Sequence, residues 1–201
     1  MQKIADFVGA LKGARLRGIT RASRAVPFLM DHAASPMESV LALMLRLPIV
    51  RGGLGLGLPK LNADVPIGEE YQRFTVARHV YPDIFFEELP LDIEYESEEF
   101  HPEMGDWDAL DPASRDAILG KTKKDKQRMR LIQTMGIRVF QVTFDDFKTS
   151  ASFDLLTEQL LKQIEDLSGK SQRRKRAQLN STKAILKRSS MLASLLEGSP
   201  T

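Results

Sequence analysis

Apolar and polar residues alternate along this chain with two different periods. In the middle of the chain, short segments rich in Val, Ile, Phe and Tyr show the period of two that is typical of half-buried strands. They predict strands near 62–67, 72–79, 82–87, 91–97 and 137–143. The short connection Glu88-Leu89-Pro90 favours an antiparallel meander through the first four. Because helical periodicity surrounds this block, the sequence predicts an α/β fold.

The best-marked helix begins after Ser35. This residue is a natural N-cap, Pro36 suits the first helical position, and Glu38 completes a capping box. Leucines and a methionine then recur at helical spacing until Pro48, where the helix must end. These signals predict a helix over 36–47.

Other helices are predicted from the same periodicity and from their terminal residues. They span about 117–135 before a C-cap at Gly136, from a cap at Ser152 to Gly169, and 184–196. Between the elements, the glycine-rich residues 51–59 are expected to form a flexible loop, and residues 102–116 an acidic one.

The elements divide the chain into three parts. Residues 35–168 form the predicted core, in which a mixed sheet is flanked by helices. Residues 1–34 are expected to be a helical arm and residues 169–201 a basic helical tail.

Composition narrows the class of protein. The chain has 201 residues, 42% of them hydrophobic and 28% charged, which is ordinary for a globular protein. It has no Cys, so disulfides and thiolate metal sites are excluded, and its three His disfavour a zinc site. No apolar run reaches the length of a membrane span, and the first thirty residues do not read as a secretory signal. We therefore expect a cytoplasmic protein with no membrane contact.

The formal net charge of +2 hides a strong segregation of charge. Residues 83–116 contain thirteen acidic residues and one basic residue, whereas residues 170–188 contain eight basic residues and no acidic one. The second segment suits contact with a polyanion such as nucleic acid. Its densest run is Arg173, Arg174, Lys175 and Arg176. The alternative is that the basic ends simply neutralise the acidic middle.

Asp83 and Glu94 are the strongest candidates for a site. Strand side chains alternate between faces, so Asp92, Glu94 and Glu96 share one face of their strand. If Asp83 lies on the preceding strand of a hairpin, it meets Glu94 across the pair. Hard carboxylate oxygens so placed suit Mg²⁺, with Mn²⁺ as a substitute. The alternative is that both are solvated hairpin acids.

Three further side chains have two interpretations each. Glu38 is explained by the capping box, but an acid on this helix could also join a metal site. Glu96 could hold a metal or a metal-bound water, or lie at the solvent edge. His101 could bind a metal, position a water or contact phosphate, or simply pack beside Phe100.

This set of motifs resembles the PD-(D/E)XK nuclease superfamily, in particular its very-short-patch-repair-like bacterial members. The resemblance covers roughly residues 35–147. Pro82-Asp83 and Glu94-Tyr95-Glu96-Ser97 match its acidic motif, and His101 follows as in those relatives. The pattern Asp125-x-x-Arg128, with Gly136 and the strand after it, matches their downstream helix and last strand. Glu96 stands where the superfamily usually has lysine.

The resemblance implies a restriction-endonuclease-like core and a Mg²⁺-dependent endonuclease acting on DNA, most simply double-stranded DNA. It implies Asp83, Glu94, Glu96 and His101 as catalytic residues, and Asp83, Glu94 and Glu38 as metal ligands. Asp125 and Arg128 would support the site, with Lys124 or Lys126 replacing the motif lysine; alternatively Asp125 and Arg128 form a surface ion pair. Because that lysine is missing, the alternative function is a catalytically inactive member that binds nucleic acid or a partner in a toxin–antitoxin or defence system.

Overall fold

The computed structural model describes residues 2–11, 18–96 and 111–197. Its helices are α1 (Gln2–Ala10), α2 (Ile19–Ala25), α3 (Pro36–Arg46), α5 (Pro112–Thr134), α6 (Asp145–Lys148), α7 (Ser150–Ser168), α8 (Arg173–Leu179) and α9 (Thr182–Glu197), with short 3₁₀ turns η1 (Val26–Phe28), η2 (Ile49–Arg51) and η3 (Glu69–Phe74). None of the helices in these ranges has both the length and the apolar character that crossing a bilayer requires.

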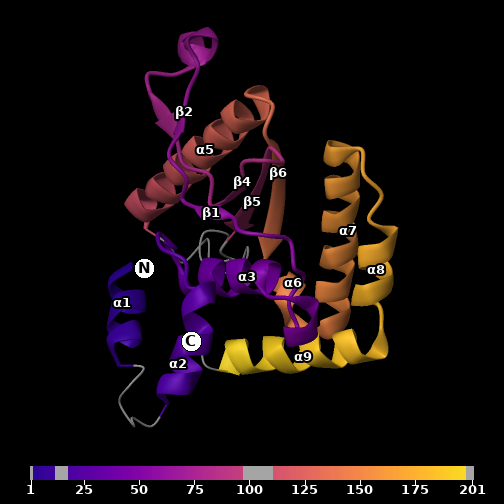
Figure 1. Ribbon diagram of the computed structural model, residues 1–201. Coiled ribbons are helices and arrows are strands. Elements are labelled where there is room, and N and C mark those ends of the chain that lie inside the picture. The colour runs from indigo at the N-terminus through magenta and orange to yellow at the C-terminus, as the bar shows by residue number, and fades with distance from the viewer. Residues whose placement is uncertain (1, 12–17, 97–110, 198–201) are drawn as a thin grey trace.

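A four-stranded mixed sheet lies among the helices (Figure 1). Its strands, in spatial order, are β1 (Lys60–Leu61), β4 (Ile84–Phe86), β5 (Leu91–Glu96) and β6 (Arg138–Thr143). The pairs β1–β4 and β4–β5 are antiparallel, and β6 is parallel to β5. The parallel pair requires a long crossover, which α5 supplies. The mixed α/β class predicted from the sequence is confirmed.

The sheet separates two apolar clusters. On one face, α3 and α7 pack against Leu91 and Ile93 of β5, both of which are essentially inaccessible. On the other face, α5 buries Ile132 against a smaller cluster that includes Phe85 of β4. Figure 1 shows α5 and α7 on opposite sides of the strands. Both faces of β5 are therefore covered, including the face that carries its acids.

Helix α3 begins as the sequence predicts. The Ser35 side chain accepts a hydrogen bond from the Glu38 backbone N–H, and Pro36 occupies the first turn. A cap of this kind contributes on the order of 1 kcal/mol.

The glycine-rich segment after α3 is packed, in contrast to the flexible loop that the sequence predicts. The Leu54 backbone N–H donates to the Met44 carbonyl, and the Leu54 side chain is 1% exposed. A Cβ at Gly53 would stand 2.1 Å from the Leu47 carbonyl oxygen. Glycine is used here because the loop backbone runs directly against the end of α3.

Three predicted elements differ in the structure. Of the predicted strand over 62–67, only Val65 and Pro66 are in a strand, β2. The sequence predicts a strand over 72–79, but most of this segment belongs to η3 or to irregular backbone, and β3 (His79–Val80) is short. It pairs with β2 (Val65–Pro66), and together with η3 they form an arm that projects beyond the sheet beside α5 (Figure 1). Helix α5 starts at Pro112, several residues earlier than predicted, because the Asp111 side chain caps it by accepting from the Ser114 N–H.

The end of α5 and both ends of α7 are defined by caps. Gly136 has φ +82°, the left-handed conformation predicted for it, and Gly169 ends α7 in the same way with φ +65°. The N-cap of α7 is Thr149 rather than Ser152, since the Thr149 hydroxyl accepts from the Ser152 N–H.

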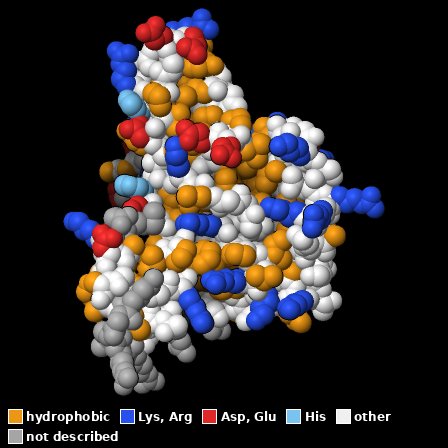
Figure 2. Space-filling model, in the orientation of Figure 1, with side chains coloured by type: hydrophobic (Ala, Val, Ile, Leu, Met, Phe, Trp, Pro, Cys, Tyr) orange, Lys and Arg blue, Asp and Glu red, His pale blue; other side chains and the backbone are white. Residues whose placement is uncertain are grey.

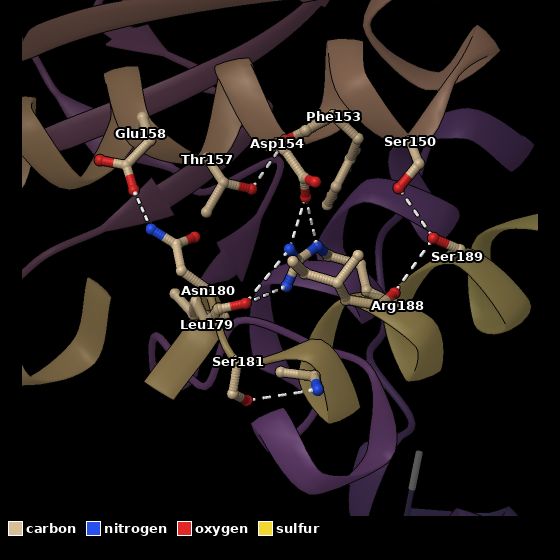
Figure 3. Close-up of polar contacts among 12 residues, drawn as sticks. Ser150, Phe153, Asp154, Thr157, Glu158, Leu179, Asn180, Ser181, Arg188 and Ser189 are labelled. Atoms are coloured by element: carbon tan, nitrogen blue, oxygen red, sulfur yellow. Dashed lines mark hydrogen bonds and ion pairs between the residues drawn. The ribbon is translucent and has the colours of Figure 1, made fainter. Parts of the chain in front are cut away.

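Helices α8 and α9 pack on the main core. Leu179 and Leu192 are 0% and 4% exposed and belong to the same cluster as α3 and α7. Arg188 of α9 is 2% exposed and donates to Asp154 of α7 and to the Leu179 carbonyl (Figure 3). A second contact between the same helices joins the Ser150 and Ser189 hydroxyls. The segment predicted as a basic tail thus forms a layer of the folded body.

Candidate active site

Asp83 and Glu94 meet across the β4–β5 hairpin. Ile84 pairs with Ile93, so continuing the antiparallel register by one position sets Asp83 opposite Glu94. The Asp83 carboxylate accepts a hydrogen bond of 3.1 Å from the Tyr95 backbone N–H. This arrangement is the one that strand alternation predicts for the two acids.

A third acid, Asp92, lies on the same face and is fully buried. Its neighbours on the adjoining strands are Phe85 and Val139, both apolar. Among the described residues, neither Asp92 carboxylate oxygen has a hydrogen-bond donor. Asp92 lies within hydrogen-bonding reach of the Glu94 carboxylate. Because both groups are acceptors, their contact is favourable only with a proton or a cation between them.

Arg128 is the cation that α5 brings to these acids. It donates 2.8 Å from one terminal nitrogen to Glu94 Oε1, and its other terminal nitrogen contacts Glu94 Oε2. It also donates to the Tyr81 carbonyl at 2.9 Å. This two-pronged geometry fixes the orientation of the Glu94 carboxylate.

The local charges shift the acid–base equilibria of the site. Burial, with the neighbouring charges of Glu94 and Glu38, raises the pKa of Asp83 to about 7. Burial and the contact with Glu94 raise the pKa of Asp92 to about 9. Burial would lower the pKa of Arg128, but Glu94 outweighs it and the pKa is raised. Arg128 therefore faces three acids. Their raised pKa values show that Asp83 and Asp92 are more stable with a proton or beside a further cation.

Glu38 approaches this site from α3, although the hydrogen bonds of its side chain go to the start of the helix and to Asn62. Its Oε2 accepts from the Ala34 backbone N–H at 2.8 Å and from the Asn62 side-chain nitrogen at 3.1 Å. Its charge nevertheless acts on Asp83. The capping interpretation and the site interpretation are thus compatible, because one carboxylate anchors the helix and lies near the acids.

Asn62 is a connection that is not among the predicted site residues. Its φ is +45°, and its backbone N–H donates to the Asp83 carbonyl while its side chain reaches Glu38 and the His32 carbonyl. It ties the start of α3 to the start of β4. The residue type was the available signal, since Asn tolerates the left-handed conformation.

The remaining candidates lie at the rim or outside the described residues. Glu96 is half-buried at the end of β5 and accepts from Gln141 at 3.3 Å. His101 lies outside the described residues. Asp125 is half-buried on α5, one turn before Arg128, and no bond between the two is described. Lys124 and Lys126 are exposed, so the cation at the acids is Arg128.

The donor chemistry fits a hard divalent cation, with a limit on the number of ligands. Asp83, Asp92 and Glu94 offer carboxylate oxygens, and the two orphaned oxygens of Asp92 call for a positive partner. Within the described ranges, however, no three Asp, Glu or His side chains are grouped closely enough to hold one ion together. Mg²⁺ is commonly held by one or two carboxylates while it keeps several waters or contacts substrate phosphate. Asp83 and Glu94, at facing positions of the hairpin, are two such carboxylates.

The basic run on α8 separates into two kinds of residue. Arg176 pairs with Glu158 and Glu165 of α7, and Lys175 donates to the Gly55 carbonyl, with its pKa lowered by burial. Arg173 and Arg174 are exposed. The lower right of Figure 2, over α7 to α9, shows Lys and Arg side chains and no Asp or Glu among the residues coloured by type. Arg173 and Arg174 are therefore the exposed cations of this run.

Comparisons with protein-family models, with curated proteins and with solved structures find no match to this chain.

Proposed function

We propose that this chain is a metal-dependent nuclease that hydrolyses phosphodiester bonds of DNA, with Asp83 and Glu94 as metal ligands. The observation that carries the proposal is the buried carboxylate group, in which neither Asp92 oxygen has a donor among the described residues and Arg128 faces three acids. A folded protein tolerates such a group when a proton or a cation offsets its charge.

The fold supports the same function. The main sheet and its helices come in the chain order α3, β1, β4, β5, α5 and β6, with the β2–β3 pair inserted between β1 and β4. This order fits the restriction-endonuclease-like core that the sequence resemblance implies. The two proposed ligands come from adjacent strands at the face covered by α5.

Each side chain has a role that follows from its contacts. A bound divalent cation supplies polarisation of the scissile phosphate and a lowered pKa of the attacking water. Arg128 holds Glu94 in one orientation through two hydrogen bonds, and the Tyr95 N–H orients Asp83. Arg128 also brings positive charge next to the developing charge on the phosphate.

A second candidate function is a catalytically inactive protein that binds nucleic acid with the same fold. The observation that favours it is the Arg128–Glu94 pair, because a guanidinium bonded to both oxygens already supplies a cation at this position. Glu96, which stands where the superfamily usually has lysine, points in the same direction.

The test separates the two functions. Asp83→Asn and Glu94→Gln each remove an anionic ligand with little change in volume, so each is expected to abolish cleavage of supercoiled plasmid and single-stranded circular DNA in Mg²⁺ or Mn²⁺. Calorimetric titration with Mn²⁺ should show binding to the wild type that both variants lose. Circular dichroism controls for folding.

A third variant, Glu38→Gln, resolves the two roles of Glu38. If its role is capping alone, glutamine replaces it and cleavage is unchanged. If its charge also supports the metal, cleavage falls while the melting temperature stays the same.

Full activity of both Asp83→Asn and Glu94→Gln would refute the site. Wild-type protein that neither binds Mn²⁺ nor cleaves DNA would favour the inactive binder.

A further inference from the structure

A groove of about 640 Å³ lies beside the candidate active site. One wall is the exposed side of α5, and the other is the segment 74–81 that leads through β3 back to the sheet. Arg128 belongs to its lining and bonds both to the Tyr81 carbonyl and to Glu94. A ligand in this groove would therefore lie next to the carboxylates.

The lining of the groove carries a small excess of positive charge. Lys124 and Arg130 line it against Asp125, while the charge of Arg128 is paired with Glu94. The side chains of Lys124 and Arg130 are exposed, so their charges are available at the surface. An excess of positive charge in a concave site raises the local concentration of anions.

The opposite wall carries aromatic rings that the fold leaves uncovered. Phe74 is 59% exposed and Tyr81 is 51% exposed, and both line the groove. The guanidinium of Arg73 lies 4.6 Å from the centre of the Phe74 ring, so a flat cationic group can stack on this ring. Exposed aromatics next to cations are the combination with which proteins hold unpaired nucleotides, since bases stack on the rings and phosphates meet the cations.

The size of the groove selects the form of the nucleic acid. Its volume falls within the roughly 300–1,000 Å³ of small-ligand pockets, which suits a nucleotide or two and is too small to enclose a duplex. We propose that this groove holds a single-stranded segment of nucleic acid, with a base stacked on Tyr81 or Phe74 and phosphates at Lys124 and Arg130. The choice of nucleic acid as ligand rests on the proposed function, which this inference narrows from DNA of either form to an unpaired strand.

Fluorescence anisotropy with a short labelled oligothymidylate, in EDTA so that no cleavage occurs, tests this proposal on the 201-residue chain. Tyr81→Ala and Phe74→Ala are expected to weaken binding, by about tenfold for the ring that stacks on a base. Tyr81→Ala keeps the backbone carbonyl that bonds Arg128. The matched control is Phe7→Ala, which removes a 65% exposed ring on α1 and should leave binding unchanged.

The cations are tested by a second matched pair. Lys124→Gln should weaken binding and reduce the salt dependence by about 0.7 log unit per log unit of salt, the contribution of one single-strand phosphate contact. Lys123→Gln removes the same charge from an exposed position of α5 that does not line the groove, and should have little effect.

The outcomes distinguish this inference from the nuclease proposal. Binding is measured in EDTA and cleavage in Mg²⁺, so the two proposals have separate readouts. If no variant and no wild type cleaves but the groove variants lose binding, the nuclease proposal fails and the groove assignment stands. Unchanged binding in both aromatic variants, a matched duplex that binds as tightly as the oligothymidylate, or equal competition by polyglutamate would overturn the groove assignment.

Discussion

At the scale of single residues, the main feature of the candidate site is that acidic side chains are buried close together. Asp92 is fully buried between apolar strand neighbours and has no donor among the described residues. A protonated carboxyl tolerates that environment better than a carboxylate, and this is why its pKa is raised.

The raised pKa values predict how stability varies with pH. A carboxyl group whose pKa is higher in the folded state than its ordinary 3.8 keeps its proton longer when folded, so its stabilisation is present at low pH and lost as the pH rises. For Asp83 this stabilisation is lost between about pH 4 and pH 7, and for Asp92 between about pH 4 and pH 9. The free energy of unfolding of the metal-free protein should therefore fall across this window.

Asp92→Asn should flatten that decline, because the amide has nearly the same shape, carries no charge and can donate to Glu94. At pH 8 we expect the variant to be more stable than the wild type by at least about 1 kcal/mol. Urea unfolding in EDTA at a series of pH values, followed by circular dichroism, measures the effect. Asp116→Asn removes an exposed acid of α5 and is the control. Identical pH profiles for Asp92→Asn and the wild type would contradict the assignment.

Sequence reasoning could find the pair but not the whole group of acids. Asp83 and Glu94 face each other because strand alternation and the short hairpin fix their register, and both are visible in the sequence. Asp92 shares their face, but its burial depends on Ile132 and the rest of α5, which cover that face from a distant part of the chain. Strand alternation alone predicts that an acid on this face is exposed to solvent. The burial of Asp92 could not be predicted because it depends on tertiary packing.

At the scale of elements, local capping signals predicted the helices better than propensity predicted the strands. Ser35 and Gly136 cap as expected because their bonds lie within a few residues. The prediction of a strand over 72–79 was wrong because residues 72–74 belong to the 3₁₀ turn η3, which starts after Gly68. The aromatic and β-branched residues of this segment suit either structure. The Asp111-Pro112 start of α5 was a missed cap, hidden by the acidic composition around it.

Helix α8 allows a test of its basic run, because its cations differ in their partners. Replacing Arg173 and Arg174 together with Gln should weaken binding to DNA and lower the salt slope by up to about 0.9 log unit for each duplex phosphate that these side chains neutralise. The melting temperature should not change, since both side chains are exposed. Fluorescence anisotropy with labelled DNA at several salt concentrations gives the slope.

The matched control for this double variant is Arg176→Gln. It removes one cation from the same helix but breaks the ion pairs with Glu158 and Glu165, so it should lower the melting temperature. Binding that is indifferent to Arg173 and Arg174 would make the run a solvated surface of α8 that does not bind nucleic acid.

At the scale of the whole molecule, the C-terminal helices are part of the body that supports the site. Leu179 and Leu192 lie in the cluster that also contains Leu91 and Ile93 of β5, the strand that carries Glu94. Arg188 adds a buried connection to α7 (Figure 3). From its basic composition, this segment was predicted to be a tail. Apolar residues at helical spacing predict an apolar helix face but not the element that it packs against.

The prediction at this scale compares two leucines of α9 with opposite exposure. Leu192→Ala removes a side chain that is 4% exposed and should destabilise the protein by about 2–5 kcal/mol, as buried leucines do. Leu186→Ala removes one that is 66% exposed and should change the free energy of unfolding by less than about 0.5 kcal/mol. Chemical denaturation followed by circular dichroism measures both. If α9 were a detached tail, the two variants would unfold alike at the wild-type midpoint. A large loss of stability in Leu192→Ala alone, in a single cooperative transition, would show that the sheet and the C-terminal helices unfold as one unit.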